Sequence, residues 1–190
     1  MKKIFCLLYI IIFPLSLIRA ELITPNNGSV LTYVHVLFEW EEIPGSTGYE
    51  LQVSGANDFT THLSINTPEP FYIEKDYINW QSSYYWRVRA NDGDWMNPNQ
   101  FSTGETSVTF QNDDKPIEIL EYNPALASDG IIIYGSYYNN YSAAIDMDGN
   151  EVWNSGGVNT HVFFGVNENN NYLGGKFFPQ YNNALIGCEF

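Results

Sequence analysis

Two segments of this 190-residue chain alternate bulky apolar and polar residues with a period of two. The repeating apolar positions are Val, Val, Phe and Trp in residues 34–40, and Tyr, Trp, Val and Ala in residues 84–90. This pattern is typical of β-strands that bury one face, because successive side chains of a strand point to opposite sides. No stretch of the chain keeps a helical period. We therefore expect an all-β protein built from short antiparallel strands.

The composition indicates a folded and strongly acidic protein. Hydrophobic residues make up 44% of the chain and aromatic residues 16%. This excludes a disordered chain, because disordered segments lack the apolar side chains that a core requires. Lys and Arg number 8 against 22 Asp and Glu, which gives a formal net charge of −14. Such a surface repels phosphate groups, so we expect no nucleic-acid partner.

The first twenty residues have the pattern of a secretory signal. Lys2 and Lys3 precede an apolar run at 4–18, and Ala20 offers a small residue at the cleavage site. We therefore expect residues 1–20 to be removed and the protein to be secreted or periplasmic. The alternative is a membrane anchor, but the apolar run is shorter than the roughly 20 residues that a membrane span needs. No membrane span is expected once the signal is removed.

Residues 21–110 are predicted to form one β-sandwich of seven strands, with two antiparallel sheets packed face to face. The aromatic and apolar residues expected at the centre of its core are Trp40, Tyr49, Tyr84, Trp86 and Val88. After a turn that contains Pro and Gly, the strand at 49–54 is expected to alternate inward and outward side chains. Its outward residues are expected to be Glu50, Gln52 and Ser54. The residues expected to close the module are Phe101, Val108 and Phe110.

The same part of the chain resembles a fibronectin type III domain. The resemblance rests on Trp40, on Gly-Tyr-Glu-Leu-Gln-Val-Ser at 48–54 and on Tyr-Tyr-Trp-Arg-Val-Arg-Ala at 84–90. It implies that Tyr84, six residues after Ile78, bonds back to the backbone at a strand corner. Domains of this kind are mostly spacers or binding modules, so the resemblance implies an architecture and no particular chemistry.

Arg87 and Arg89 are expected on the outward face of their strand, because they alternate with its apolar residues. Two interpretations are open for this pair. The arginines bind a ligand, or they pair with acidic neighbours on a strongly acidic surface. The second interpretation is favoured, since ion pairs of this kind are common on protein surfaces and contribute little to stability.

The polar segment 111–116 ends in a proline and is predicted to be a linker. Beyond it the chain carries the signals of two hairpins. Asp-Gly-Asn at 148–150 is predicted to form a two-residue turn, because Gly and Asn tolerate a positive φ. Residues 161–166 and 172–175 are predicted to pair across an Asn-rich turn, and a further strand is expected at 184–190.

The spacing of these strands predicts the start of a β-propeller over residues 117–190. Ile145, directly before the Asp-Gly-Asn hairpin, and Phe190 are 45 residues apart. Four-stranded propeller blades recur at roughly 40–50 residues. A single blade exposes apolar faces that require neighbouring blades, so we expect this part to be truncated. The alternative is a complete domain of another β-fold.

Residues 145–153, Thr160-His161 and 167–173 resemble the first blade of the propeller of bacterial arylsulfotransferases. The resemblance implies transfer of a sulfuryl group from an aryl sulfate to a phenolic acceptor through a covalent His intermediate. It implies that His161 lies near the channel and helps to bind the sulfate. The catalytic set would belong to later blades, so no catalytic residue is assigned here. The alternative for His161 is an ordinary residue at the start of a strand.

The chain departs from the arylsulfotransferase pattern at two positions. Asn170 stands where the family has Gly, and Thr160 stands where many members have a second His.

No metal or cofactor is expected. Asp146 and Asp148 before Gly149 invite comparison with a calcium loop, but position twelve is Gly157 and the required Glu is missing. The chain has no paired Cys or His for zinc and no phosphate-binding Gly loop.

Two classes of function remain open from the sequence. The first is the N-terminal part of an exported arylsulfotransferase-like enzyme, with the sandwich as an added domain. The second is a secreted, non-enzymatic adhesion or carbohydrate-binding protein, in which sandwich and propeller are both scaffolds. Basic residues lining the channel of further blades would favour the first class.

Overall fold

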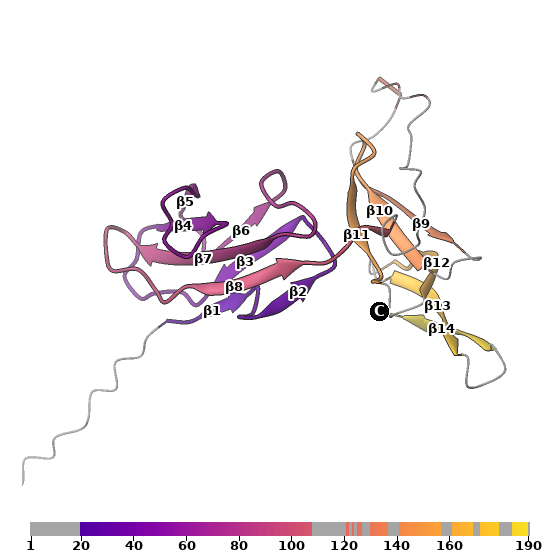
Figure 1. The fold of residues 1–190 in the computed structure, drawn as a ribbon, viewed down its shortest axis with the longest axis horizontal. Coiled ribbons are helices and arrows are strands. Elements are labelled where there is room, and N and C mark those ends of the chain that lie inside the picture. The colour runs from indigo at the N-terminus through magenta and orange to yellow at the C-terminus, as the bar shows by residue number, and fades with distance from the viewer. Residues whose placement is uncertain are drawn as a thin grey trace, which may run out of the picture.

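The named elements of the structure, a computed structural model, are all strands, and they run from β1 to β14 in chain order (Figure 1). The prediction of an all-β fold is therefore confirmed. The structure describes residues 20–107, 121, 123, 125–126, 130–136, 141–156, 161–168, 172–178 and 184–189. Several predicted features lie outside these residues, namely positions 1–19 of the expected signal, the linker at 111–116, Val108 and Phe110.

The first eight strands form two sheets. The smaller sheet has the order β1-β3-β6, made by Leu22–Thr24, Val36–Trp40 and Phe71–Glu74. The larger sheet has the order β2-β8-β7-β4-β5, made by Ser29–Leu31, Asn99–Thr103, Ser83–Ala90, Tyr49–Ser54 and Leu63–Thr67. Neighbouring strands are antiparallel except β2 and β8, which run parallel. We refer to β1–β8 as the sandwich region.

Over residues 21–107, which the structure describes, the sandwich region has eight strands, one more than the seven predicted for 21–110. The chain pairs first with β3 as β1 and then, after a short turn, with β8 as β2. Gly28 sits in that turn with φ of 80°, and the Ser29 amide donates to the Asn26 carbonyl at 3.1 Å. A left-handed residue of this kind favours Gly because no Cβ is in the way. The turn therefore divides the first segment between the two sheets.

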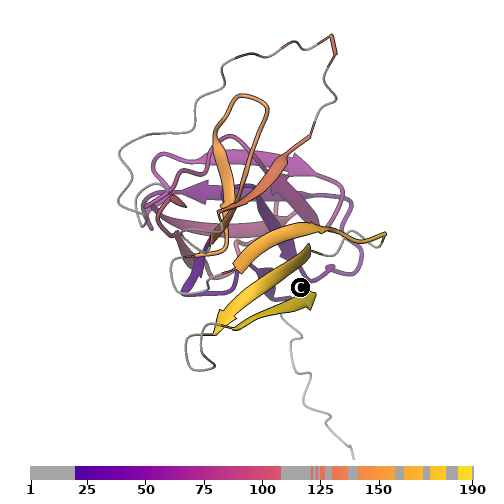
Figure 2. The same ribbon diagram turned by 90° about the vertical axis from the view of Figure 1, so that its right-hand side faces the viewer.

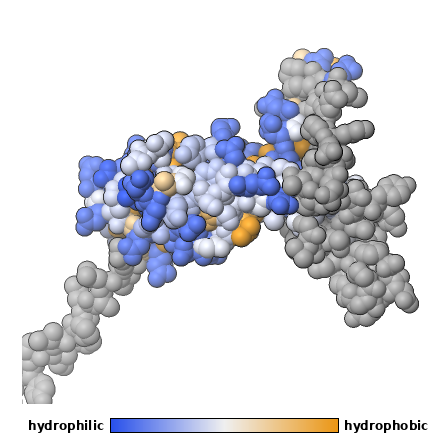
Figure 3. Space-filling view, viewed as in Figure 1, coloured by the Kyte–Doolittle hydropathy of each residue, from blue (hydrophilic) through white to orange (hydrophobic). Residues whose placement is uncertain are grey.

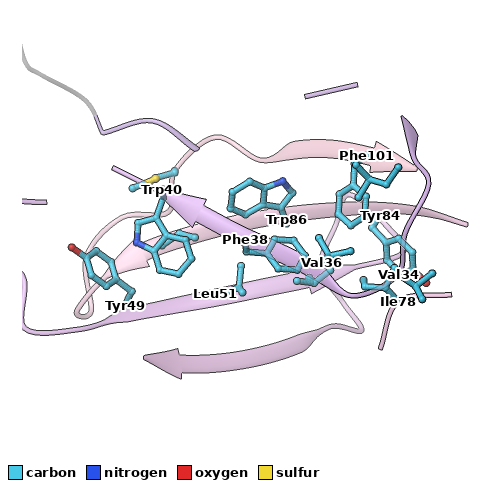
Figure 4. Packing of buried hydrophobic residues seen from close by; sticks show 14 of the residues in the cluster. Val34, Val36, Phe38, Trp40, Tyr49, Leu51, Ile78, Tyr84, Trp86 and Phe101 are labelled. Carbon is cyan, nitrogen blue, oxygen red and sulfur yellow. The ribbon is translucent and has the colours of Figure 1, made fainter. Parts of the chain in front are cut away.

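Large aromatic side chains fill the space between the two sheets (Figure 4). Phe38 of β3 meets Trp86 of β7 edge to face at 5.2 Å between ring centres, and it meets Phe101 of β8 at 5.8 Å. Trp40 meets Tyr49 in the same way at 5.4 Å. Such edge-to-face pairs add to the stabilisation from burial. The predicted core residues are all buried, namely Trp40, Tyr49, Tyr84, Trp86 and Val88.

The predicted bond of Tyr84 to the backbone is confirmed. The Asn79 amide donates a hydrogen bond to the Tyr84 hydroxyl oxygen at 2.9 Å. Ile78, the residue that defined the expected spacing, is buried beside it in the same core cluster. The bond ties the loop before β7 to the strand that follows it.

Gln52 and Ser54 lie on the predicted outward side of β4, but both residues are buried there. The Gln52 carbonyl oxygen accepts two hydrogen bonds from the Arg87 guanidinium group, at 3.1 and 2.8 Å. The Ser54 hydroxyl donates to the Thr61 carbonyl at 2.7 Å. The loop between β4 and β5 thus folds back over the end of β4. It covers the side of β4 that the alternating sequence pattern predicts to face solvent.

The remaining strands form two three-stranded sheets, which we call the C-terminal sheets. One has the order β11-β10-β9, made by Glu151–Asn154, Tyr141–Ile145 and Ile132–Ser136. The other has the order β12-β13-β14, made by His161–Val166, Tyr172–Phe178 and Ala184–Glu189. Both predicted hairpins and the predicted last strand are present, and all pairs are antiparallel.

The turn between β10 and β11 is longer than predicted. It spans residues 146–150, and of these Gly149 alone has a positive φ, at 86°. The carboxylate of Asp146 organises the turn by accepting from the amides of Asp148 and Asn150, at 3.0 and 2.8 Å. The turn is thus built on a carboxylate that bonds to its own backbone, as Asp often does.

The β9–β11 sheet is joined to one end of the sandwich region by backbone hydrogen bonds (Figure 2). The Val34 amide donates to the Val152 carbonyl, and the Asn154 amide donates to the Thr32 carbonyl, both at 2.9 Å. Tyr33 and Trp153 form the antiparallel bridge between these bonds. The segment before β3 therefore pairs with the edge of β11, and this covers an edge that would otherwise expose unpaired backbone groups.

Candidate functional site

His161, the predicted sulfate-binding residue, begins β12 and lies opposite Lys176 in the register with β13. β12 lies against β9 and β10. The surroundings of the His161 side chain are outside the described part of the structure. A role of His161 in sulfate binding therefore stays a prediction. Its predicted position at the start of a strand is confirmed.

A polar cleft of about 460 Å³ lies where the sandwich region meets the β10–β11 hairpin. We call it the junction cleft. One wall comes from the loop after β6 and the other from the turn at 146–150. Its lining is Val34, His35, Lys75, Asp76, Ile78, Asn79, Trp80, Thr106, Asp146, Asp148, Asn150, Glu151 and Val152.

A buried carboxylate builds the sandwich-side wall. Glu74 accepts hydrogen bonds from three consecutive backbone amides, those of Lys75, Asp76 and Tyr77, at 3.0, 2.7 and 2.8 Å. Three such bonds compensate the cost of burying the carboxylate. The loop that carries Lys75 and Asp76 is therefore fixed from within.

Glu151 lines the junction cleft and bonds to residues of the sandwich region and of β11. Its carbonyl oxygen accepts from the Trp80 indole nitrogen at 2.7 Å. Its carboxylate accepts from the Ser107 amide at 2.8 Å, from the Ser107 hydroxyl, and from the Asn154 side-chain amide at 2.7 Å. Asn154 also donates to the Glu105 carbonyl at 3.0 Å. One side chain of β11 thus fastens the end of the sandwich region to the C-terminal sheets.

The charges of the junction cleft oppose the binding of a sulfate ester there. Its lining contains four carboxylates and one lysine. An acidic lining raises the energy of an anion and lowers that of a cation. Within the described residues, no group of three His, Cys, Asp or Glu is placed to hold a metal ion. We therefore do not place the predicted sulfate site in the junction cleft.

The two arginines of β7 lie in an aromatic and polar array on the outer face of the larger sheet. The guanidinium carbon of Arg87 is 4.0 Å from the centre of the Phe59 ring and 4.3 Å from that of Trp95. Arg89 donates to one oxygen of the Glu50 carboxylate at 2.8 and 2.5 Å. The predicted pairing with an acidic neighbour is thus confirmed for Arg89. Arg87 instead donates to the Gln52 side-chain oxygen and lies over two rings, which is a favourable cation–π arrangement.

The electrostatics of this array are those of a self-contained network. Burial lowers the pKa of Arg87, with the negative charge of Glu50 acting in the opposite direction. Burial acts to raise the pKa of Glu50, but hydrogen bonds from Ser64, Arg89 and Gln52, with the charge of Arg89, hold it below its ordinary value. The array therefore uses its charges internally, which disfavours the ligand-binding interpretation of the two arginines.

Sequence reasoning missed Phe59 and Trp95 as partners of Arg87. Phe59 is buried and has a φ of 53°, an unusual backbone conformation for a bulky residue. Its carbonyl oxygen lies 2.6 Å from Nδ1 of His62. The sequence offered one signal for this contact. Phe59 and Trp95 are aromatic residues in otherwise polar segments, and the strand at 83–90 carries two arginines.

Comparison with models of protein families finds no match for this chain. Comparison with curated proteins finds no relative either. No helix in the described part of the structure is long and apolar enough to cross a membrane.

Proposed function

We propose that this chain is the N-terminal part of an exported arylsulfotransferase-like protein that transfers a sulfuryl group from an aryl sulfate to a phenol. The observation that carries the proposal is the order of strands after the sandwich region. The β10–β11 hairpin is closed by the turn organised by Asp146, and β12 then begins at His161. This order agrees with the hairpin, histidine and short strand on which the resemblance rests. The secretory pattern of residues 1–20 supports export.

In this proposal the sandwich region resembles a fibronectin type III domain and supports the start of a propeller. The backbone pairing of Thr32 and Val34 with β11 supports that role, because it fixes the first sheet in one orientation. His161 would donate to a sulfate oxygen and stabilise the charge that develops during transfer. The nucleophile and the remaining donors would be supplied by later blades.

The test is transfer of sulfate from a chromogenic aryl sulfate to phenol by the full-length protein and its His161→Ala variant. Loss of one donor to a developing charge lowers turnover by about 10²–10³-fold. His35→Ala is the control, because His35 lines the junction cleft in the sandwich region. Transfer that is absent from the folded full-length protein would contradict the enzyme. Transfer that is unchanged in His161→Ala would keep the enzyme and remove His161 from the site.

A second candidate, a secreted adhesion protein without catalysis, is favoured by a different observation. Four large apolar side chains lie exposed together on the smaller sheet of the sandwich region. Exposed apolar surface of this kind marks a contact with another molecule. Such a protein would bind its partner through this surface and show no sulfate transfer.

A further inference from the structure

The outer face of the β1-β3-β6 sheet exposes four large apolar residues. Their exposed fractions are 42% for Ile23, 39% for Leu37, 47% for Phe71 and 49% for Ile73. We call these four residues the apolar face. All three strands of the sheet contribute to it. The opposite side of β3 carries the buried core residues Val36, Phe38 and Trp40.

The strand register brings three residues of the apolar face together, Leu37, Phe71 and Ile73. Leu37 and Ile73 are direct partners across β3 and β6, so their side chains lie side by side on one surface. Phe71 is two residues from Ile73 on the same strand and therefore shares its face. On the other side of β3, Thr24, which follows Ile23, pairs with Glu39.

The apolar face differs in kind from the rest of the sandwich surface. The outer face of the larger sheet carries the Glu50, Gln52, Arg87 and Arg89 network described above. In the view of Figure 3, hydrophobic residues of the sandwich region appear as small separate patches among hydrophilic ones. Single exposed apolar residues are ordinary, but a group across three adjacent strands is a mark of an interaction site.

A carboxylate lies within the apolar face. Glu39 is the register partner of Phe71 on one side and of Thr24 on the other, which places it between Phe71 and the residue that follows Ile23. Among the described residues, none donates a hydrogen bond to the Glu39 carboxylate or pairs with it. Glu41 and Glu69, both exposed, follow at the same end of the sheet. The Glu41 carboxylate accepts a hydrogen bond from the Glu21 amide at 3.1 Å, so the face combines apolar contact area with the unpaired negative charge of Glu39.

This charge selects the kind of molecule that fits the apolar face. A second copy of the chain would bring carboxylates against carboxylates, since acidic residues outnumber basic ones 22 to 8. Anionic lipid surfaces and nucleic acids are repelled for the same reason. The complementary surface is a protein segment with apolar side chains around an arginine or lysine that reaches Glu39.

We propose that the apolar face is the docking site for a partner protein that presents an apolar, basic segment. Apolar contact with Leu37, Phe71 and Ile73 supplies the buried area. An ion pair with Glu39 sets the register and excludes acidic or neutral segments. This inference does not depend on sulfate transfer, because it concerns a different surface of the molecule.

The experiment titrates the 190-residue protein with two synthetic peptides of twelve residues. One alternates Leu and Arg, and the matched peptide alternates Leu and Glu. Backbone and methyl NMR signals of Leu37 and Ile73 report binding at the face. We expect the Leu-Arg peptide to shift these signals with saturation, and the Leu-Glu peptide to leave them unchanged.

Three variants separate the parts of the proposal. Ile73→Ser removes contact area. We expect it to lower the affinity for the Leu-Arg peptide about tenfold, as loss of a central apolar contact does. Glu39→Gln keeps the side-chain size, and we expect it to remove most of the preference for the Arg peptide. Val30→Ser is the matched control, because Val30 is 68% exposed on β2, outside the apolar face. It should leave binding unchanged.

Several results would overturn the proposal. The first is that the Leu-Arg peptide leaves the signals of Leu37 and Ile73 unshifted. The second is that both peptides bind with equal affinity. The third is that Ile73→Ser and Val30→Ser lower the affinity for the Leu-Arg peptide equally. Sedimentation of the free protein provides a further test. A dimer that Ile73→Ser dissociates would show that a second copy covers the face.

Discussion

The sandwich region and the β9–β11 sheet obtain their cores in different ways. The sandwich region buries its own large aromatic side chains between two sheets, with Phe38 and Trp40 on one side and Trp86 and Phe101 on the other. In β10 the buried residues are mostly small, Ser142, Ala143 and Ala144, followed by Ile145. Ala144 and Val152 belong to the same buried cluster as the sandwich core. One region supplies its own core, and the other extends a core that is already there.

The two regions are stabilised by contributions of different size. Full burial of a large apolar side chain contributes about 1.5–3 kcal/mol, and the sandwich core contains many of them. A typical intramolecular hydrogen bond contributes only about 0.5–1.5 kcal/mol net. The β9–β11 sheet depends largely on backbone pairing with Thr32 and Val34 and on the contacts of Glu151. Damage to the sandwich should therefore unfold both regions, whereas damage to the junction should loosen only one.

The largest effect is expected from Trp40→Ala. Trp40 is fully buried, and its indole nitrogen has no hydrogen-bond partner within the described residues, so the loss is one of packing. We expect the free energy of unfolding to fall by about 3–5 kcal/mol, as for other large aromatic deletions in cores. Urea denaturation followed by circular dichroism measures it. Both regions should unfold in one transition.

Phe71→Ala is the matched control for Trp40→Ala, because it removes an exposed aromatic ring from the same sheet. Surface substitutions usually stay within about 0.5 kcal/mol. If Trp40→Ala and Phe71→Ala had equal effects, the sandwich core would not have the importance assigned to it here.

A smaller and local effect is expected from Glu151→Ala. The change leaves the Ser107 hydroxyl, the Ser107 amide and one Asn154 side-chain donor without their acceptor. An unsatisfied buried donor costs about 1–3 kcal/mol. We expect faster hydrogen exchange at the amides of Val34 and Asn154, which bridge the two regions, and unchanged exchange at Val53 in the sandwich core.

Glu105→Ala is the control for Glu151→Ala. The Glu105 side chain is exposed, and Asn154 uses only its backbone carbonyl, which the substitution retains. Its exchange rates should match those of the unaltered protein. Equal acceleration at Val34 and Val53 in Glu151→Ala would contradict a local role of Glu151, because the sandwich core would then be destabilised as much as the junction.

The strands of the sandwich core could be predicted from sequence because their residues alternate strictly. Val36, Phe38 and Trp40 repeat at every second position, and burial follows that pattern directly. The C-terminal hairpins were marked by turn residues, such as Gly149 with its positive φ. Both signals are local, so neither needs knowledge of which strands pair.

The features that escaped prediction depend on contacts between distant segments. Gln52 and Ser54 alternate as outward residues, yet a loop and Arg87 cover them. Glu151 meets Ser107, 44 positions away in the chain, and no local pattern marks that pairing. The predicted site residue His161 was located only as the start of β12, because the resemblance gives its position in sequence and not its neighbours.

Tyr84→Phe tests a single bond inside the sandwich region. It removes the hydroxyl that accepts from the Asn79 amide and keeps the ring in the core. We expect the free energy of unfolding to fall by about 0.5–1.5 kcal/mol, the net contribution of one hydrogen bond. Tyr85→Phe is the matched control, since Tyr85 lies on the opposite face of the same strand. Equal effects would mean that the bond at the strand corner adds nothing to the stability of the core.

The smallest effect is expected at the ion pair on the outer face, and pH reveals it. Hydrogen bonds and the charge of Arg89 outweigh burial and hold the pKa of Glu50 below 4.5, so ionised Glu50 stabilises the folded protein. That contribution is complete above pH 4.5 and is lost as the pH falls through the lower pKa of the folded state. An ion pair at a protein surface contributes about 0.2–1 kcal/mol. Glu50→Gln should therefore lower the free energy of unfolding by this amount at pH 6 and have less effect at pH 3.

Glu69→Gln, which removes an exposed carboxylate from a loop, corrects for the change in net charge. A Glu50→Gln effect that stayed constant from pH 6 to pH 3 would show that the amide and hydroxyl contacts of Gln52 and Ser64, and not the charge of Arg89, account for the stability of the array.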